Sequence, residues 1–129
     1  MHVAATVLLI EDHAPNRKVI SKVLRQDDYQ VVEACDGAIA LEMLQTMHCD
    51  LVITDFLMPK LSGIKFVEQL HSLQPQMPII LITGYPSTIS ATTIVEKVAA
   101  VLAKPFELDV LRSTVRRLLA TTPHGTPNG

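Results

Sequence analysis

Short apolar runs alternate along the chain with longer segments whose apolar residues recur every three or four positions. Three runs, at 7–10, 51–53 and 79–82, are apolar at successive positions. Strands of this kind are typical of a parallel sheet that helices cover on both faces. The other two runs are less apolar, so we expect them near the sheet edges. The predicted strands are Thr6–Ile10, Gln30–Ala34, Leu51–Thr54, Ile79–Thr83 and Ala99–Ala103.

The segments between these strands are long enough for crossover helices. Apolar residues stand at helical spacing in Pro15–Arg25, Gly37–Met47, Ser62–Leu73 and Leu108–Leu119. Pro15 suits a first helical turn, and Ser62 suits an N-cap. On the last helix we expect Arg112, Arg116 and Arg117 to remain in water. The alternating order predicts an α/β fold, an open doubly wound five-stranded parallel sheet with right-handed crossovers.

The fourth helical segment, Pro86–Val98, is unusual because seven of its thirteen residues are β-branched. Each such residue costs up to ~0.7 kcal/mol in helix propensity relative to alanine. Two interpretations are open. Packing can simply override the propensity, or the segment can be an element that shifts easily, as a switch would require.

Length and composition limit the alternatives. With 129 residues we expect one domain over residues 1–120 and a disordered tail over 121–129, which lacks apolar periodicity. A net charge of −2 argues against a nucleic-acid binder, and no apolar run approaches the ~20 residues of a membrane span. The N-terminus lacks the basic region of a signal peptide. We interpret Cys35 and Cys49 as reduced packing residues of a cytoplasmic protein.

Candidate chemistry gathers where the predicted strands end. Glu11 and Asp12 follow the first strand, Asp55 the third, Thr83 the fourth and Lys104 the fifth. Taken singly, each residue has an ordinary explanation as a cap, a strand former or a solvated charge. Together they meet at one edge, because the carboxyl ends of parallel strands lie on the same side of the sheet. This is the edge at which open α/β sheets bind their ligands.

Three carboxylates at one edge need a compensating cation. Two carboxylates ~4 Å apart at an effective dielectric near 20 repel by roughly 4 kcal/mol. Oxygen ligands without Cys or His select a hard ion, and Mg²⁺ is the expected one. Asp55 is the best-placed nucleophile, and attack on phosphorus would give an aspartyl phosphate whose charge the metal and Lys104 would neutralise.

Four segments together resemble the receiver domain of two-component response regulators. They are Val-Leu-Leu-Ile-Glu-Asp at 7–12, Leu-Val-Ile-Thr-Asp-Phe-Leu-Met-Pro at 51–59, Ile-Leu-Ile-Thr-Gly at 80–84 and Lys-Pro-Phe at 104–106. The resemblance covers about residues 5–120. It implies a flavodoxin-like (βα)5 sheet of order 2-1-3-4-5 and metal-dependent transfer of a phosphoryl group from a phosphohistidine.

The resemblance also implies roles for single residues. Asp55 matches the phospho-acceptor, and Lys104 matches the lysine that contacts the phosphoryl group. Glu11 and Asp12 match the acidic pair that, with Asp55 and the backbone carbonyl of Leu57, holds Mg²⁺ or Mn²⁺. The module would catalyse its own phosphorylation and dephosphorylation and is not otherwise an enzyme.

Further matches concern the switch. Thr83 matches the switch hydroxyl, Lys104–Pro105 a cis peptide bond and Gly63 a turn glycine. The chain departs from the family at Val101, where an aromatic residue is usual, and Tyr85 is a candidate substitute or an ordinary exposed loop residue. Leu57 and Tyr85 are both bulky, and we hypothesise that they shield the acyl phosphate from water.

The expected partners are a histidine kinase or a phosphotransfer protein and, downstream, a protein effector or a second copy. The effector or second copy would bind through the fourth and fifth helical segments, Pro86–Val98 and Leu108–Leu119, and the fifth strand, Ala99–Ala103. We expect neither nucleic acid nor membrane as a direct partner. A phosphate shuttle is an alternative, because Asn16-Arg17 resembles receivers attached to hybrid kinases. A haloacid-dehalogenase-like phosphatase needs a second Asp at position 57, which is Leu, and a flavin module needs a phosphate loop where Glu-Asp-His-Ala-Pro-Asn stands.

Overall fold

The computed structural model describes residues 4–57, 61–87 and 93–121 and contains one five-stranded sheet. Its strands are β1 (Thr6–Ile10), β2 (Gln30–Ala34), β3 (Leu51–Asp55), β4 (Ile79–Thr83) and β5 (Ala100–Ala103). All neighbouring strands pair in parallel, in the order β2-β1-β3-β4-β5. The predicted fold class and strand order are confirmed, and the two less apolar strands lie at the edges as expected.

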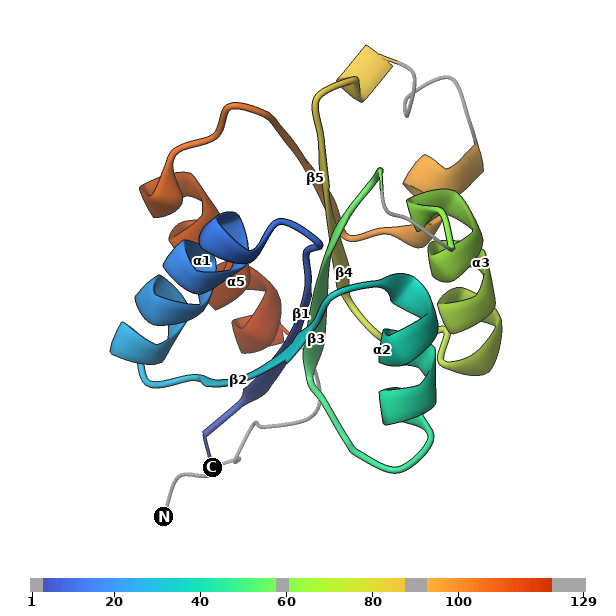
Figure 1. Ribbon diagram of the computed structural model, residues 1–129, viewed down its shortest axis with the longest axis horizontal. Coiled ribbons are helices and arrows are strands. Elements are labelled where there is room, and N and C mark those ends of the chain that lie inside the picture. The colour runs from blue at the N-terminus through green and yellow to red at the C-terminus, as the bar shows by residue number, and fades with distance from the viewer. Residues whose placement is uncertain (1–3, 58–60, 88–92, 122–129) are drawn as a thin grey trace.

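Helices cover both faces of this sheet (Figure 1). They are α1 (Ala14–Gln26), α2 (Gly37–Leu44), α3 (Gly63–Leu73), the 3₁₀ helix η1 (Thr93–Lys97) and α5 (Leu108–Thr121). Helices α1 and α5 lie on one face, and α2 and α3 on the other. Pro15 lies in the first turn of α1, and the Ser62 hydroxyl caps α3 by accepting a hydrogen bond from the Lys65 N–H at 3.3 Å, both as predicted.

Two helix predictions need correction. The helix predicted over Gly37–Met47 ends at Leu44, where the N–H groups of Gln45 and Thr46 begin to bond to carbonyls three positions earlier. The predicted helix over Pro86–Val98 falls partly on residues 88–92, which lie outside the described chain. Where it is described, residues 93–97 form a 3₁₀ helix instead of an α-helix. The β-branched content of this segment lowers α-helix propensity and is the physical reason we assign.

Two apolar cores lie on opposite sides of the sheet. Successive residues of β1 point alternately into them, so that Leu8 packs on the side of α2 and α3 and Leu9 on the side of α1 and α5. This arrangement explains why the central strands carry apolar residues at successive positions. Not every apolar residue of these helices is buried: Val19, Ile39 and Leu73 are exposed.

Polar contacts tie α1 to α5. Arg112 is half-buried and binds Asp27 with two nitrogens, Nε at 2.9 Å and Nη2 at 2.8 Å, which corrects the expectation that it stays in water. Arg116 and Arg117 are exposed as predicted.

Both cysteines are free, and Cys49 is buried, but Cys35 is exposed and is therefore not a packing residue. Among the described residues, no helix has the length and apolar character needed to cross a bilayer.

Candidate functional site

Three carboxylates converge at the carboxyl edge of the sheet. Glu11 and Asp12 directly follow β1, and Asp55 is the last residue of β3, the neighbouring parallel strand. Each side chain offers one oxygen, and these oxygens all lie within 4.8 Å of one another. Asp12 is exposed, whereas Glu11 and Asp55 are only 4% and 5% exposed. The structure thus brings together the acidic residues that the strand ends predicted.

Lys104 meets this cluster from the end of β5. Its Nζ lies 2.8 Å from Oδ2 of Asp55, in a charge-assisted hydrogen bond. Burial alone would lower the pKa of Lys104, but the bond to Asp55 and the surrounding carboxylates outweigh it and raise that pKa. Burial, reinforced by the charge of Asp55, raises the pKa of Glu11. The peptide bond between Lys104 and Pro105 is cis, as predicted.

The predicted switch residues lie beside the cluster with different exposures. Thr83 ends β4, is buried, and its hydroxyl oxygen accepts a hydrogen bond from the Tyr85 N–H at 2.9 Å. The Tyr85 side chain is 59% exposed. Val101, at the position where an aromatic ring is usual, is half-buried in β5 and packs its short aliphatic side chain against the core on the side of α2 and α3.

The loop after β3 is held by a close approach of α3. The Leu57 N–H points to Oδ1 of Asp55 at 3.4 Å, while the Leu57 side chain is 60% exposed. The Gly63 N–H donates to the Phe56 carbonyl at 3.0 Å. A Cβ at Gly63 would lie 2.6 Å from that same oxygen and 2.8 Å from the Asp55 carbonyl. The turn glycine predicted here is therefore required by contact with backbone, and residues 58–60 of the motif lie outside the described chain.

The donors present fit a divalent cation. Three carboxylates and one ammonium leave an excess of negative charge around a cleft of about 450 Å³, which Asp12, Asp55 and Lys104 help to line. All candidate ligands are oxygens, the donors that Mg²⁺ and Mn²⁺ accept. One carboxylate is already oriented, since the His13 N–H donates to Oε2 of Glu11 at 3.0 Å, while the exposed His13 ring stays in water.

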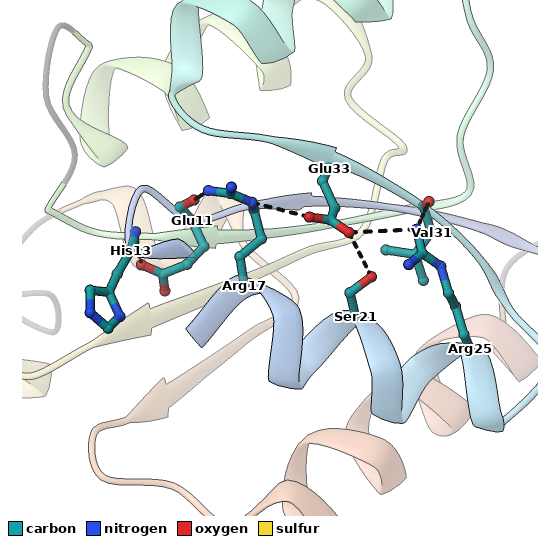
Figure 2. A network of polar contacts seen from close by, with 7 residues as sticks. All are labelled: Glu11, His13, Arg17, Ser21, Arg25, Val31 and Glu33. Carbon is teal, nitrogen blue, oxygen red and sulfur yellow. Dashed lines mark hydrogen bonds and ion pairs between the residues drawn. The ribbon is translucent and has the colours of Figure 1, made fainter. Parts of the chain in front are cut away.

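The acidic cluster is supported from behind by residues whose role was not predicted from the sequence. Arg17 contacts the Glu11 carbonyl, and it is itself bonded to Glu33 on β2, which also accepts from Ser21 (Figure 2). One signal was available: Glu33 is a lone carboxylate within the apolar strand Gln-Val-Val-Glu-Ala, where an unpaired charge would be costly.

Known proteins resemble this chain over most of its length. The family model for the response regulator receiver domain matches residues 7–116. The response regulator receiver protein CpdR of Brucella abortus is 32% identical over 114 residues, which are 88% of this chain and 95% of CpdR. The sensor kinase CckA of the same organism is also 32% identical, but the match spans 90% of this chain and only 13% of that kinase. The transcriptional regulatory protein GlrR of Escherichia coli is matched over 26% of its length.

Solved structures agree with these relatives. The response regulator TrrA from Thermotoga maritima, determined with Mg²⁺-BeF, superposes with a TM-score of 0.82 at 26% identity, covering 88% of this chain and 98% of TrrA. The chemotaxis response regulator CheY4 of Vibrio cholerae gives a TM-score of 0.80 at 28% identity, over 90% and 99% of the two chains. With its strand order, acidic edge and motifs, the chain belongs to the response regulator receiver domain family of two-component signalling.

Proposed function

We propose that Asp55 is the residue that accepts the phosphoryl group, delivered from a histidine of a kinase or of a phosphotransfer protein. The observation that carries this proposal is the position of Asp55 between two partners. Its Oδ2 is bonded to Lys104, and it shares the cluster with Glu11 and Asp12. A carboxylate held between an ammonium and a cation site is oriented before the donor arrives.

The transfer would exchange one bond to phosphorus for another. An oxygen of Asp55 forms the new O–P bond, the P–N bond of the donor histidine breaks, and its electron pair returns to the imidazole, which takes up a proton. Lys104 neutralises charge on the phosphoryl oxygens. Bound Mg²⁺ or Mn²⁺ would add positive charge at the same oxygens, held by Glu11, Asp12, Asp55 and the carbonyl of Leu57.

Intact-mass spectrometry after incubation with acetyl phosphate tests this proposal. The wild type should gain one phosphoryl group with Mg²⁺ and lose the gain with EDTA. Asp55→Asn should stay unmodified. Asp28→Asn is the matched control, because Asp28 lies in the turn after α1 at φ 70°, a conformation that Asn tolerates well. Equal modification of Asp55→Asn and wild type would refute the assignment.

Self-catalysed loss of the phosphoryl group is the second part of the proposal. Water must reach the acyl phosphate through the cleft that Leu57 and Tyr85 line. Both side chains are bulky and more than half exposed, so they can cover the phosphoryl group. A Leu57→Asn, Tyr85→Glu double variant should therefore lose phosphate faster than the parent. Unchanged decay of the phosphorylated mass with time would contradict this shielding.

Thr83 is the proposed switch hydroxyl, with Tyr85 and Val101 beside it. Phosphorylation would draw the Thr83 hydroxyl away from the Tyr85 N–H and alter the face formed by η1, β5 and α5. Exposed Val95 and Val110 give this face apolar surface for a protein effector or a second copy of the chain. Amide hydrogen exchange with and without phosphodonor should change on this face, and a change confined to α1 and α2 would contradict it.

A phosphate shuttle is the second candidate, favoured by the 32% identity to a segment of the sensor kinase CckA. A shuttle would return the group from Asp55 to a second histidine. Incubating the phosphorylated protein with a histidine phosphotransfer domain should then transfer the phosphoryl group to that domain. A terminal receiver would release the group only as inorganic phosphate.

Two broader assignments complete the proposal. We assign residues 1–120 to the receiver domain, supported by the match over residues 7–116. The tail predicted over 121–129 starts one residue later, because α5 extends to Thr121. A cytoplasmic location is supported by the free thiols of Cys35 and Cys49.

A further inference from the structure

Arg17 connects the acidic edge to the neighbouring strand. It lies near the start of α1, and Figure 2 shows its guanidinium between two acceptors. Nη1 donates to the main-chain carbonyl of Glu11 at 2.8 Å, and Nε donates to Oε1 of Glu33 at 3.1 Å. The Arg17 side chain is 19% exposed, so both bonds are partly shielded from water. The planar fork of arginine suits two acceptors that lie on different elements.

Glu33 is itself fixed. Its second carboxylate oxygen accepts from the Ser21 hydroxyl at 2.9 Å and lies 3.5 Å from Nη2 of Arg25, which also donates to the Val31 carbonyl (Figure 2). The Arg17 guanidinium therefore pairs with a carboxylate outside the acidic cluster, which it shares with Arg25. Its direct contact with the cluster is a hydrogen bond to a main-chain carbonyl, so the effect we assign to Arg17 is one of geometry.

The carbonyl that Arg17 binds controls where the chain goes after β1. The Glu11 N–H donates to the Ala34 carbonyl at 3.1 Å, and the chain then leaves the sheet. The peptide unit between Glu11 and Asp12 is planar, so holding its oxygen fixes the direction in which Asp12 continues. Without such a hold, repulsion among the three carboxylates would favour moving exposed Asp12 away.

We infer that Arg17 is a positioning residue, which holds the Glu11–Asp12 peptide so that both carboxylates face the cation site; this inference rests on the proposed function of that site. It touches neither the cation ligands' carboxylates nor the phosphoryl group. Removing a group that orients a metal ligand from behind typically lowers the metal affinity 10–100-fold. We therefore expect Arg17→Ala to weaken Mg²⁺ binding by about 10-fold.

The test is a Mg²⁺ titration of the full chain without phosphodonor, followed by amide chemical shifts at neutral pH. Arg17→Lys keeps a positive charge but loses the fork, so it should bind Mg²⁺ nearly as weakly as Arg17→Ala. Glu33→Gln releases Arg17 from β2 and should give a smaller loss. Lys18→Ala is the matched control, because Lys18 is the adjacent exposed cation on α1 and its removal changes the net charge equally.

The outcomes separate this inference from the proposed function. If wild type binds Mg²⁺ and Arg17→Ala, still folded, binds it equally well, Arg17 has no positioning role and Asp55 chemistry is untouched. If Arg17→Ala and Lys18→Ala weaken binding equally, charge is responsible and the inference is overturned. Should Arg17→Ala not fold, Arg17→Lys decides, and wild-type affinity in that variant overturns the inference. Absence of Mg²⁺ binding by wild type refutes both proposals.

Discussion

Gly63→Ala tests whether the contact between α3 and the loop after β3 is as tight as the structure indicates. Two effects oppose each other. Alanine in place of glycine in a helix interior stabilises by about 0.5–1 kcal/mol, which is an upper limit for Gly63 because it is the first residue of α3. Here the added Cβ would lie 2.6 Å from the Phe56 carbonyl oxygen and 2.8 Å from that of Asp55. Both are backbone atoms, so no flexible side chain can yield.

Relief requires α3 to move away from the loop, which stretches the hydrogen bond from the Gly63 N–H to Phe56, 3.0 Å long. Overpacking of this kind costs about 1–3 kcal/mol, and the lost hydrogen bond about 1 kcal/mol more. The clash therefore wins, and we expect a net loss of about 2 kcal/mol after the propensity gain. At roughly 4 °C per kcal/mol for a chain of this size, Tm should fall by about 8 °C.

Thermal unfolding followed by circular dichroism measures this difference. Gly84→Ala is the control, because a Cβ there meets nothing within 4 Å. Its Tm should stay within about 2 °C of wild type, the range of a neutral surface change. If Gly63→Ala were as stable as Gly84→Ala, the close approach would not exist in solution. The reason given for the turn glycine would then be wrong.

Two further predictions concern α1–α5 and the cysteines. Arg112 holds the pKa of Asp27 below its usual range, so the pair stabilises the fold above the ordinary aspartate pKa, and this contribution is lost as pH falls through the lowered value. Arg112→Ala should therefore lower the urea midpoint of unfolding at pH 7. The difference in midpoint between variant and wild type should become smaller below about pH 4, and a larger difference there would contradict the pairing. Burial raises the pKa of the Cys49 thiol to about 12, so iodoacetamide should label exposed Cys35 in the folded protein and Cys49 only after unfolding; peptide masses report both, and equal labelling rates would contradict the burial of Cys49.

The sequence predicted most of the sheet because the burial of both strand faces leaves a strong pattern. The limits of β1, β2 and β4 agree with the structure, and β3 is one residue longer because it includes Asp55. Pattern was weaker where propensity and packing disagree. The segment after Tyr85 has apolar spacing of a helix but a β-branched composition, and its described end is a 3₁₀ helix.

The candidate site divides in the same way. Strand ends meet at one edge for topological reasons, so Glu11, Asp12 and Asp55 could be assigned together. The side-chain contacts behind that edge could not be predicted, because Arg17 and Glu33 are sixteen residues apart in the sequence and no local spacing links them. Their pairing depends on how α1 packs against β2, which only three-dimensional structure reveals.

The carboxyl edge of the sheet is also where the chain connects the sheet to the helical layers on its two faces. Chain leaving β1 enters the helical layer on one face, and chain leaving β3 enters the layer on the other, with α3 in contact with the backbone of Phe56. A backbone movement at this edge would therefore act on the helices of both faces. A phosphoryl group added at Asp55 could therefore change the outer surface by two routes, through α1 on one face of the sheet and through α3 on the other.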